Sequence, residues 1–444
     1  MVTTLLIIFI VGYILIASEH VLGVNKATFA LIMCGLLWAV YSLCTHDPNI
    51  SSEMVEALGD TCEIVVFLIG AMTIVELIDR YGGFKIMIDK IHASNKRKLL
   101  WILALVAFFM SAVLDNMTTT IIMVMMLRRM LQDQKERWMF ACTIVLAANA
   151  GGAWSPIGDI TTIMLWMKNY VSSVDLIENL LLPSLVSVIV PVFIASRMIP
   201  ASPMEERNSQ DNRIGYDMSK EHPKISRVIL WCGIGGLLFV PVFKATTHLA
   251  PYMGILLSLG VLWLMTELLV RHYKLDGKIE GRISQVMRNI DMSTILFFLG
   301  ILMAVSALSQ AGILGELAGW LNNTMHNVYA INGIIGVLSS IVDNVPLVAA
   351  CMEMYPVAND AMIAAASDPA YTALFVEDGL FWHLLTFCAG VGGSMLIIGS
   401  AAGVVAMGIE KIPFMWYLKR ITWLAFSGYI AGIAMIWLMD LILN

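Results

Sequence analysis

The chain has 444 residues, of which 59% are hydrophobic and 14% are charged, and its mean hydropathy is +0.81. Soluble domains have about 45–50% apolar and about 25% charged residues, so this composition excludes an ordinary soluble protein and predicts an all-α polytopic membrane protein. The net charge of −6 excludes little, because the placement of lysine and arginine, and not their sum, orients a membrane protein.

The first apolar stretch, at about 2–18, has no basic segment before it and no small-residue cleavage site after it. It therefore predicts a retained first span rather than a signal peptide. Further stretches are long enough to cross a hydrocarbon core of about 30 Å, which gives about ten spans in total. They lie at about 26–44, 61–79, 138–166, 180–199, 228–243, 251–270, 291–309, 379–409 and 421–441.

Lysine and arginine cluster between these stretches, while residues 289–410 contain neither. By the positive-inside rule, the basic loops lie on the cytoplasmic side, and we expect this to be the cytoplasmic side of a bacterial inner membrane. The basic loops are 80–98, 128–137, 200–227 and 271–288. Seven cysteines are scattered without a CxxC pair, which is typical of small apolar core residues, and we expect no cofactor.

Residues 99–127 are strongly apolar, yet they carry Asp115 and Asn116 near their middle. A straight helix of this length would measure about 44 Å, which is too long for one upright span and too short for two. Both flanks are basic, "NKRK" before and "LRRM" after. We therefore expect a re-entrant hairpin over about 98–130 with the polar pair at its tip; a single tilted helix is the alternative.

A second Asp-Asn pair, Asp343 and Asn344, lies in the middle of the apolar run 336–352. Neither flank of this run is basic, which places both of its ends on the outer side. The sequence therefore predicts a second re-entrant hairpin over about 329–354. By length alone, an ordinary span remains the alternative.

Three blocks recur along the chain in the same order, which predicts an internal repeat. Asp115 and Asp343 are 228 residues apart, and two glycine matches in the preceding block are 230 apart. The third block is glycine-rich and recurs after 241 residues. The matched glycines are Gly70 with Gly300, Gly82 with Gly312, Gly151 with Gly392, Gly152 with Gly393, and Gly158 with Gly399.

Counting crossings from the basic clusters makes the two halves run in opposite directions through the membrane. Residues 1–199 and 228–444 are therefore predicted to be inverted repeats, each with five spans and a hairpin, and 200–227 a cytoplasmic linker. Inverted repeats with broken helices near the midplane are the plan of many secondary transporters. The predicted fold is thus an inverted-repeat transporter with two re-entrant hairpins and two broken helices.

The two glycine-rich blocks lie inside long apolar stretches, where they would interrupt a helix and free backbone carbonyl groups. Hard oxygen ligands gather around these interruptions, and such ligands suit Na⁺, Li⁺ or Mg²⁺ better than soft metals. The polar side chains are Asn149, Ser155, Asp159, Thr161 and Thr162 in the first block and Ser394 and Ser400 in the second. Because Ser400 stands where the first half has Asp159, we do not expect two equal cation sites.

Asp115, Asp159 and Asp343 have no lysine or arginine in the same segments. Unpaired carboxylates at membrane depth would repel an anion, and they require a metal ion or a proton to be tolerated. We therefore expect a pocket free of basic side chains, in which a proton and a metal ion displace each other.

With these residues in view, the chain resembles the NhaD-type sodium/proton antiporters of the ion-transporter superfamily, which also includes arsenite pumps and dicarboxylate carriers. The resemblance rests on "SAVLDNMTTTIIM", "NAGGAWSPIGDITT", "VDNVPLVAA" and "GGSMLIIGSAAG". It implies that two hairpins and two unwound helices form the site, and that a mobile domain moves against a scaffold that forms a homodimer.

The expected cation- and proton-binding residues are Asp115, Asn116, Thr118, Asn149, Ser155, Asp159, Thr161, Thr162, Asp343, Asn344, Ser394 and Ser400. Asp115, Asp159 and Asp343 are expected to bind Na⁺ or Li⁺ directly. The other expected partners are protons and the lipid bilayer, with no nucleic acid and no enzyme activity.

The first hypothesis is exchange of Na⁺ or Li⁺ for H⁺. Three alternatives stay open: efflux of another solute such as arsenite, an ion channel, and an intramembrane aspartyl protease whose two aspartates share a proton. The protease is disfavoured because the residues before Gly158 and Asp159 are Pro156 and Ile157, so the chain lacks a GxGD motif there.

Overall fold

The computed structural model describes residues 1–45, 49–88, 93–200, 221–273 and 286–443, and this part of the chain is helical without β-strands. Most of the predicted linker 200–227 lies outside the described residues. So do parts of the predicted basic loops 80–98 and 271–288.

Eight of the described helices are long and apolar enough to cross a membrane. They are α3 (Lys26–Thr45), α4 (Ile50–Arg80), α6 (Lys96–Leu114), α10 (Ser173–Met198), α12 (Pro223–Thr247), α13 (Pro251–His272), α15 (Met292–Gln310) and α24 (Thr422–Leu443). A ninth span results if the segment Pro369–Phe375 is joined to Leu380–Gly392 across a 50° bend. The polytopic helical fold expected from the composition is therefore confirmed.

Seven of the ten predicted spans are among these eight helices, and the eighth helix, α6, is one arm of the first predicted hairpin. The other three predicted spans differ as follows. The first apolar stretch forms the shorter α1 (Val2–Ala17), and two long stretches are each divided in two. The stretch 138–166 forms α8 (Gln134–Gly152) and α9 (Ile160–Met167), and the stretch 379–409 forms α21 (Leu380–Gly392) and α22 (Ala401–Glu410). Both interruptions coincide with the glycine-rich blocks.

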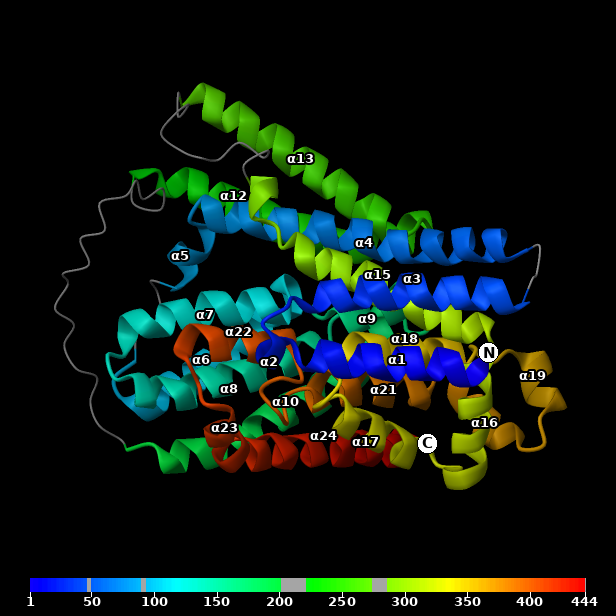
Figure 1. Ribbon diagram of the computed structural model, residues 1–444. Coiled ribbons are helices and arrows are strands. Elements are labelled where there is room, and N and C mark those ends of the chain that lie inside the picture. Colours follow the sequence, from blue (N-terminus) through cyan, green and yellow to red (C-terminus); the bar gives the residue numbers. More distant parts are fainter. Residues whose placement is uncertain (46–48, 89–92, 201–220, 274–285, 444) are drawn as a thin grey trace.

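Figure 1 shows two groups of helices lying one above the other. In the upper group, α12 and α13 pack together and against α4. α4 also contacts α15, α15 packs against α3, and α3 packs against α1. In the lower group α6, α7 (Asn116–Met130) and α8 pack together, and α10, α21 and α24 pack beside them. The groups meet where α18 (Asn344–Met354) contacts both α15 and α9.

The two glycine-rich blocks make the same backbone approach in both halves of the chain. A Cβ at Gly151 would lie 2.1 Å from the carbonyl oxygen of Phe108 in α6, and a Cβ at Gly392 would lie 2.1 Å from the carbonyl oxygen of Gly336 in α17 (Val328–Leu338). Phe108 and Gly336 are 228 residues apart, which is the spacing of Asp115 and Asp343. Only glycine permits such close contact between the helices.

A second pair of contacts follows the same register. The Ser111 hydroxyl donates a hydrogen bond of 2.6 Å to the carbonyl of Ala148, and the Ser339 hydroxyl donates one of 2.8 Å to the carbonyl of Ala389. These bonds fix α6 against α8 and α17 against α21. Gly82 and Gly312, a matched pair in the sequence, also share a positive φ, at 70° and 76°.

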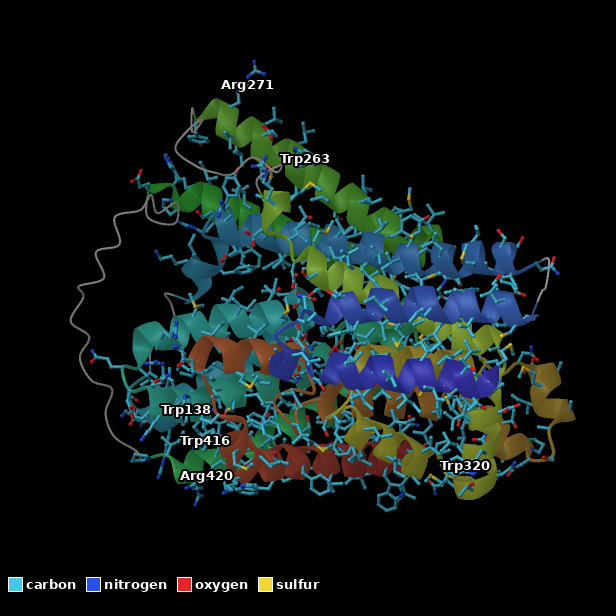
Figure 2. All side chains as sticks on the ribbon, viewed as in Figure 1. Trp138, Trp263, Arg271, Trp320, Trp416 and Arg420 are labelled. Carbon is cyan, nitrogen blue, oxygen red and sulfur yellow. The ribbon has the colours of Figure 1, made fainter. Side chains whose placement is uncertain are left out.

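One end of the molecule collects the basic and aromatic side chains expected at the inner membrane surface. Trp138, Trp416 and Arg420 lie at that end in Figure 2, while Trp320 lies at the opposite end. The Trp138 and Trp416 rings stack edge to face with centroids 5.3 Å apart.

Glu410, the last residue of α22, lies at the same end of the lower group. Its side chain is fully buried and bonds to Arg128 of α7 at 2.8 Å and to Arg137 of α8 at 2.9 Å. Its backbone carbonyl accepts a bond of 3.0 Å from the Trp138 indole N–H. Glu410 therefore ties the end of α22 to the two helices beside it.

The segment 356–378, for which the sequence suggested no role, forms a folded cap at the opposite end. It contains α19 (Asp360–Ala365), α20 (Pro369–Thr372) and the 3₁₀ turn η2 (Ala373–Phe375), and it lies near α16 (Ile313–Met325). Hydrogen bonds from the backbone N–H of Tyr371 and from His326 lower the pKa of the Asp368 carboxyl. The remaining short elements are α2 (Glu19–Leu22), α5 (Gly83–Ile88), η1 (Met287–Asn289) and α23 (Phe414–Arg420).

The glycine approaches generate the first testable prediction. We expect Gly151→Ala and Gly392→Ala to reduce the yield of folded protein and to cost at least the roughly 1–3 kcal/mol of an overpacked core, because the new methyl meets backbone that cannot move aside. Gly408→Ala in α22 is the control, since a methyl there meets nothing within 4 Å. Thermal unfolding of detergent-solubilised protein, followed by size-exclusion chromatography, measures the difference; equal behaviour of all three variants would contradict it.

The buried carboxylate of Glu410 generates the second testable prediction. Glu410→Gln leaves Arg137, whose side chain is 12% exposed, without a counter-ion, and breaking one side of a buried ion pair typically costs about 3–5 kcal/mol. We therefore expect a clear fall in the thermal unfolding temperature. Lys419→Gln, which changes an exposed charge at the same end, serves as the control and is expected to have little effect.

Candidate functional site

Asp115 separates α6 from α7, at the position where the sequence predicts the tip of the first hairpin. Its φ of 80° is in the left-handed region, which few residues other than glycine adopt. Its carboxylate accepts bonds from the Thr118 backbone N–H at 2.7 Å and the Thr118 hydroxyl at 2.8 Å. Asp115 thus caps the start of α7, and Thr118 uses its hydroxyl on this carboxylate.

The next residue, Asn116, connects this junction to the first interrupted helix. Its side-chain amide donates bonds of 2.8 Å to Asp159 and 3.1 Å to the amide oxygen of Asn149. All three side chains are buried. The α6–α7 junction and the break between α8 and α9 therefore share one hydrogen-bonded cluster.

Asn149 extends the cluster to the second half of the chain. Its amide N–H groups donate to the hydroxyl of Ser394 at 2.8 Å and to that of Ser400 at 2.9 Å. Ser400 in turn caps the start of α22 by accepting a bond from Gly403. Residues about 250 positions apart are thus brought together at the two helix breaks.

Asp159 lies at the centre of these contacts and is only 2% exposed. Its second carboxylate oxygen accepts bonds of 3.1 Å from both the N–H and the hydroxyl of Thr161, so it caps α9. The Thr162 hydroxyl donates a 3.4 Å bond to the carbonyl of Gly152 instead. Within the described part of the chain, neither Asp159 nor Asp115 forms an ion pair with a basic side chain.

Two further predicted residues lie at the helix junctions, Ser155 in the break between α8 and α9 and Asn344 at the start of α18. Ser155 is buried, and its hydroxyl donates a short bond of 2.5 Å to the carbonyl of Ala112, which connects the first break to α6. Asn344 is buried at the first position of α18, directly after Asp343. Asp343 caps α18 by accepting a bond of 3.3 Å from Val345, and α17 ends before it at Leu338.

Asp343 differs from the other two aspartates because it has a basic partner. The ammonium group of Lys26 lies 2.8 Å from its carboxylate. The prediction of a pocket free of basic side chains is therefore wrong at this residue. It failed because it considered only the segments that carry the aspartates, whereas Lys26 begins α3, 317 residues away.

Lys26 is thus a functional-site residue that the sequence prediction missed. Its one distinguishing mark in the sequence is that it is the single lysine or arginine in residues 1–44, at the start of the apolar stretch 26–44. In Figure 1 the link between α1 and α3 lies near the centre of the molecule and not at one of its ends.

Each of the three aspartates caps the start of a helix: Asp115 caps α7, Asp159 caps α9 and Asp343 caps α18. No hydrogen bond joins any two of their carboxylates among the described residues, which disfavours a catalytic pair that shares a proton. The cluster offers carboxylate, amide and hydroxyl oxygens next to two interrupted helices. Such a set suits a small hard cation or a proton.

Comparison with known proteins places this geometry in a family. A protein-family model described as "Citrate transporter" matches residues 6–376. Sodium/proton antiporter 2 of Arabidopsis thaliana is 43% identical over 427 residues, which cover 96% of this chain and 97% of that protein. The Na(+)/H(+) antiporter NhaD of Vibrio cholerae is 31% identical over 463 residues, covering 97% and 90%.

The NhaD protein of Alkalimonas amylolytica is similar over the same extent, with 29% identity across 97% of this chain. The three relatives each match 96–97% of this chain, which includes both of its halves. The chain therefore belongs to the family of NhaD-type sodium/proton antiporters within the ion-transporter superfamily.

Proposed function

We propose that this protein exchanges Na⁺ or Li⁺ for H⁺ across a membrane and uses the proton gradient to expel the metal ion. The observation that carries the proposal is the environment of Asp159, a buried carboxylate held by amide and hydroxyl groups without a basic partner among the described residues. Such a group needs compensation for its charge. A proton and a metal ion supply it in turn, which couples their movements in opposite directions.

Asp115 and Asp159 are the proposed direct ligands, and Asn149 contributes its amide oxygen. Asn116 holds the cluster together by bonding to both Asp159 and Asn149. Ser394 and Ser400 hold Asn149 from the second half. The remaining predicted residues, Thr118, Ser155, Thr161, Thr162 and Asn344, position these ligands and the ends of the interrupted helices.

We propose that residues 1–199 and 228–444 are inverted repeats and that 98–130 and 329–354 are re-entrant hairpins. The matched contacts support this arrangement, since Gly151 meets α6 as Gly392 meets α17, and Ser111 bonds to α8 as Ser339 bonds to α21. In such a plan the site alternates its access while the ligand shell stays intact. An ion channel would not require this duplicated, closely packed geometry.

The charge of the site separates cations from the other solutes carried in this superfamily. Citrate and other carboxylates are anions, and they would face two aspartates that have no basic partner in the part of the chain that the structure describes. The relatives reported above are named as sodium/proton antiporters. Arsenite efflux is therefore the less favoured alternative, and it is tested below in the same vesicles.

We propose that the end carrying Trp138, Trp416 and Arg420 faces the cytoplasm of a bacterial inner membrane, because basic residues collect there. A homodimer through the scaffold remains part of the proposal. The outer helices α12 and α13 suit that role, since they lie at the edge of the upper group in Figure 1. Cross-linking in native membranes measures this association.

The proposal predicts that Asp159→Asn abolishes Na⁺-driven release of protons, because the neutral amide can neither carry a proton nor compensate a metal ion. The measurement is Na⁺-dependent recovery of acridine orange fluorescence in everted vesicles from a bacterial strain that lacks its own sodium/proton antiporters. Asp291→Asn is the control, since Asp291 is exposed and only caps α15, a role that asparagine also fills.

The same vesicles compare Na⁺, Li⁺, K⁺, citrate and arsenite. Recovery with Na⁺ or Li⁺ alone is the expected result. Full exchange in the Asp159→Asn protein, or recovery driven by citrate or arsenite in the unchanged protein, would remove the proposal.

A milder change is expected at Asn116, which orients two ligands. Asn116→Ala removes the bonds to Asp159 and Asn149, and loss of such an orienting partner typically weakens metal affinity about 10- to 100-fold. The half-saturating Na⁺ concentration should rise by this factor while the protein stays folded. Asn327→Ala, which removes an exposed helix cap on α17, provides the matched control.

A further inference from the structure

The ion pair of Lys26 and Asp343 distinguishes the second hairpin tip from the first. Asp115 at the first tip is satisfied by neutral groups of Thr118, whereas Asp343 receives an ammonium group at 2.8 Å. The side chains of Lys26 and Asp343 are 24% and 17% exposed, so both are largely withdrawn from solvent. Surface solubility does not explain an ion pair whose two side chains are this far withdrawn from solvent.

The surroundings of Lys26 stabilise a cation. Its ammonium group lies 4.1 Å from the centre of the Phe297 ring, a distance typical of a cation–π contact. An aromatic face and a carboxylate therefore converge on the ammonium group.

The packing of α3 fixes Lys26 in this position. One turn after Lys26, α3 packs closely against α15, since a Cβ added to Gly300 of α15 would lie 2.8 Å from the backbone of Ala30. Further along α3, the Trp38 indole N–H donates a 2.9 Å bond to the carbonyl of Met303. α18, which Asp343 caps, packs against the same helix α15. The two partners of the ion pair are thus held on one common support.

The two halves are consequently unequal in charge. The first half provides Asp115 and Asp159 without basic partners among the described residues. The second half provides Asp343, which is already neutralised, and Ser400 in place of a second buried aspartate. Only one of the two related sites has negative charge available for a metal ion.

We propose that Lys26 is a tethered cation that occupies the second cation site, at Asp343, so that each chain binds a single transported metal ion at Asp115 and Asp159. The proposal rests on the proposed function, because it assigns the number of metal ions to that same site. Lys26 acts here as a specificity-determining residue that excludes a second Na⁺. Removal of its charge would open the second site.

Equilibrium binding of radioactive Na⁺ to purified full-length protein in lipid nanodiscs tests this directly. The unchanged protein is expected to bind one Na⁺ per chain. Lys26→Gln is expected to bind two, because it frees the carboxylate of Asp343. Lys26→Arg keeps a tethered cation and is expected to bind one.

The double variant Lys26→Gln with Asp343→Asn removes both charges and replaces the ion pair by two amides, so it keeps the net charge and a hydrogen-bonding pair. It is expected to bind one Na⁺, which also decides the matter if Lys26→Gln alone does not fold. Adding Asp159→Asn to Lys26→Gln should reduce its binding from two to one.

Two results would overturn the role of Lys26 while leaving the exchange function intact. These are two Na⁺ bound by the unchanged protein, or one Na⁺ bound by folded Lys26→Gln. Loss of all binding in the double variant would also overturn it, since Asp343 would then be the transport site itself. No Na⁺ bound by the unchanged protein would instead remove the proposed function.

Discussion

Asp159 accepts hydrogen bonds from Asn116 and Thr161 at the point where α8 and α9 are interrupted, and no basic side chain of the described chain neutralises it. Burial of a carboxylate in this way is costly unless its charge is compensated, and neutral hydrogen bonds only partly supply the compensation. In the proposed exchange, either a proton or a small metal ion supplies the remaining compensation, and only one of them is needed at a time. The arrangement of the helix breaks around this carboxylate follows from that requirement.

Each interrupted helix can pack closely against its neighbouring helix only because its glycine removes a side chain from the contact. Gly151 and Gly392 allow α8 and α21 to meet the backbones of α6 and α17 at a distance that a methyl group would block. The hydroxyls of Ser111 and Ser339 then join the same helix pairs through bonds to backbone carbonyls. Close packing of this kind resists small adjustments, so the cluster around Asn149 is better suited to move as one body than to deform.

Much of this arrangement could be predicted from the sequence, because the determining residues are local and chemically unusual. The Asp115 junction falls where an Asp-Asn pair interrupts an apolar run, and both helix breaks fall at glycine-rich blocks. The structure places Asn116, Asn149, Asp159, Ser394 and Ser400 in one cluster. Lys26 could not be found in this way. Its importance arises from a contact across 317 residues, and the apolar pattern around it resembles an ordinary loop between spans.

The matching family model is described as a citrate transporter, whereas the relatives reported above are named as sodium/proton antiporters, so the two descriptions name substrates of opposite charge. Hairpin tips and interrupted helices supply backbone groups of either polarity, since helix starts attract anions and free carbonyls attract cations. The side chains at the tips then select the sign. In the proposed site, Asp115 and Asp159 supply the negative charge, while Lys26 pairs with the third carboxylate, at Asp343. The sign of the charge is therefore set by aspartates at the α6–α7 junction and the α8–α9 break, and its amount by a lysine on α3, a helix that packs against α15.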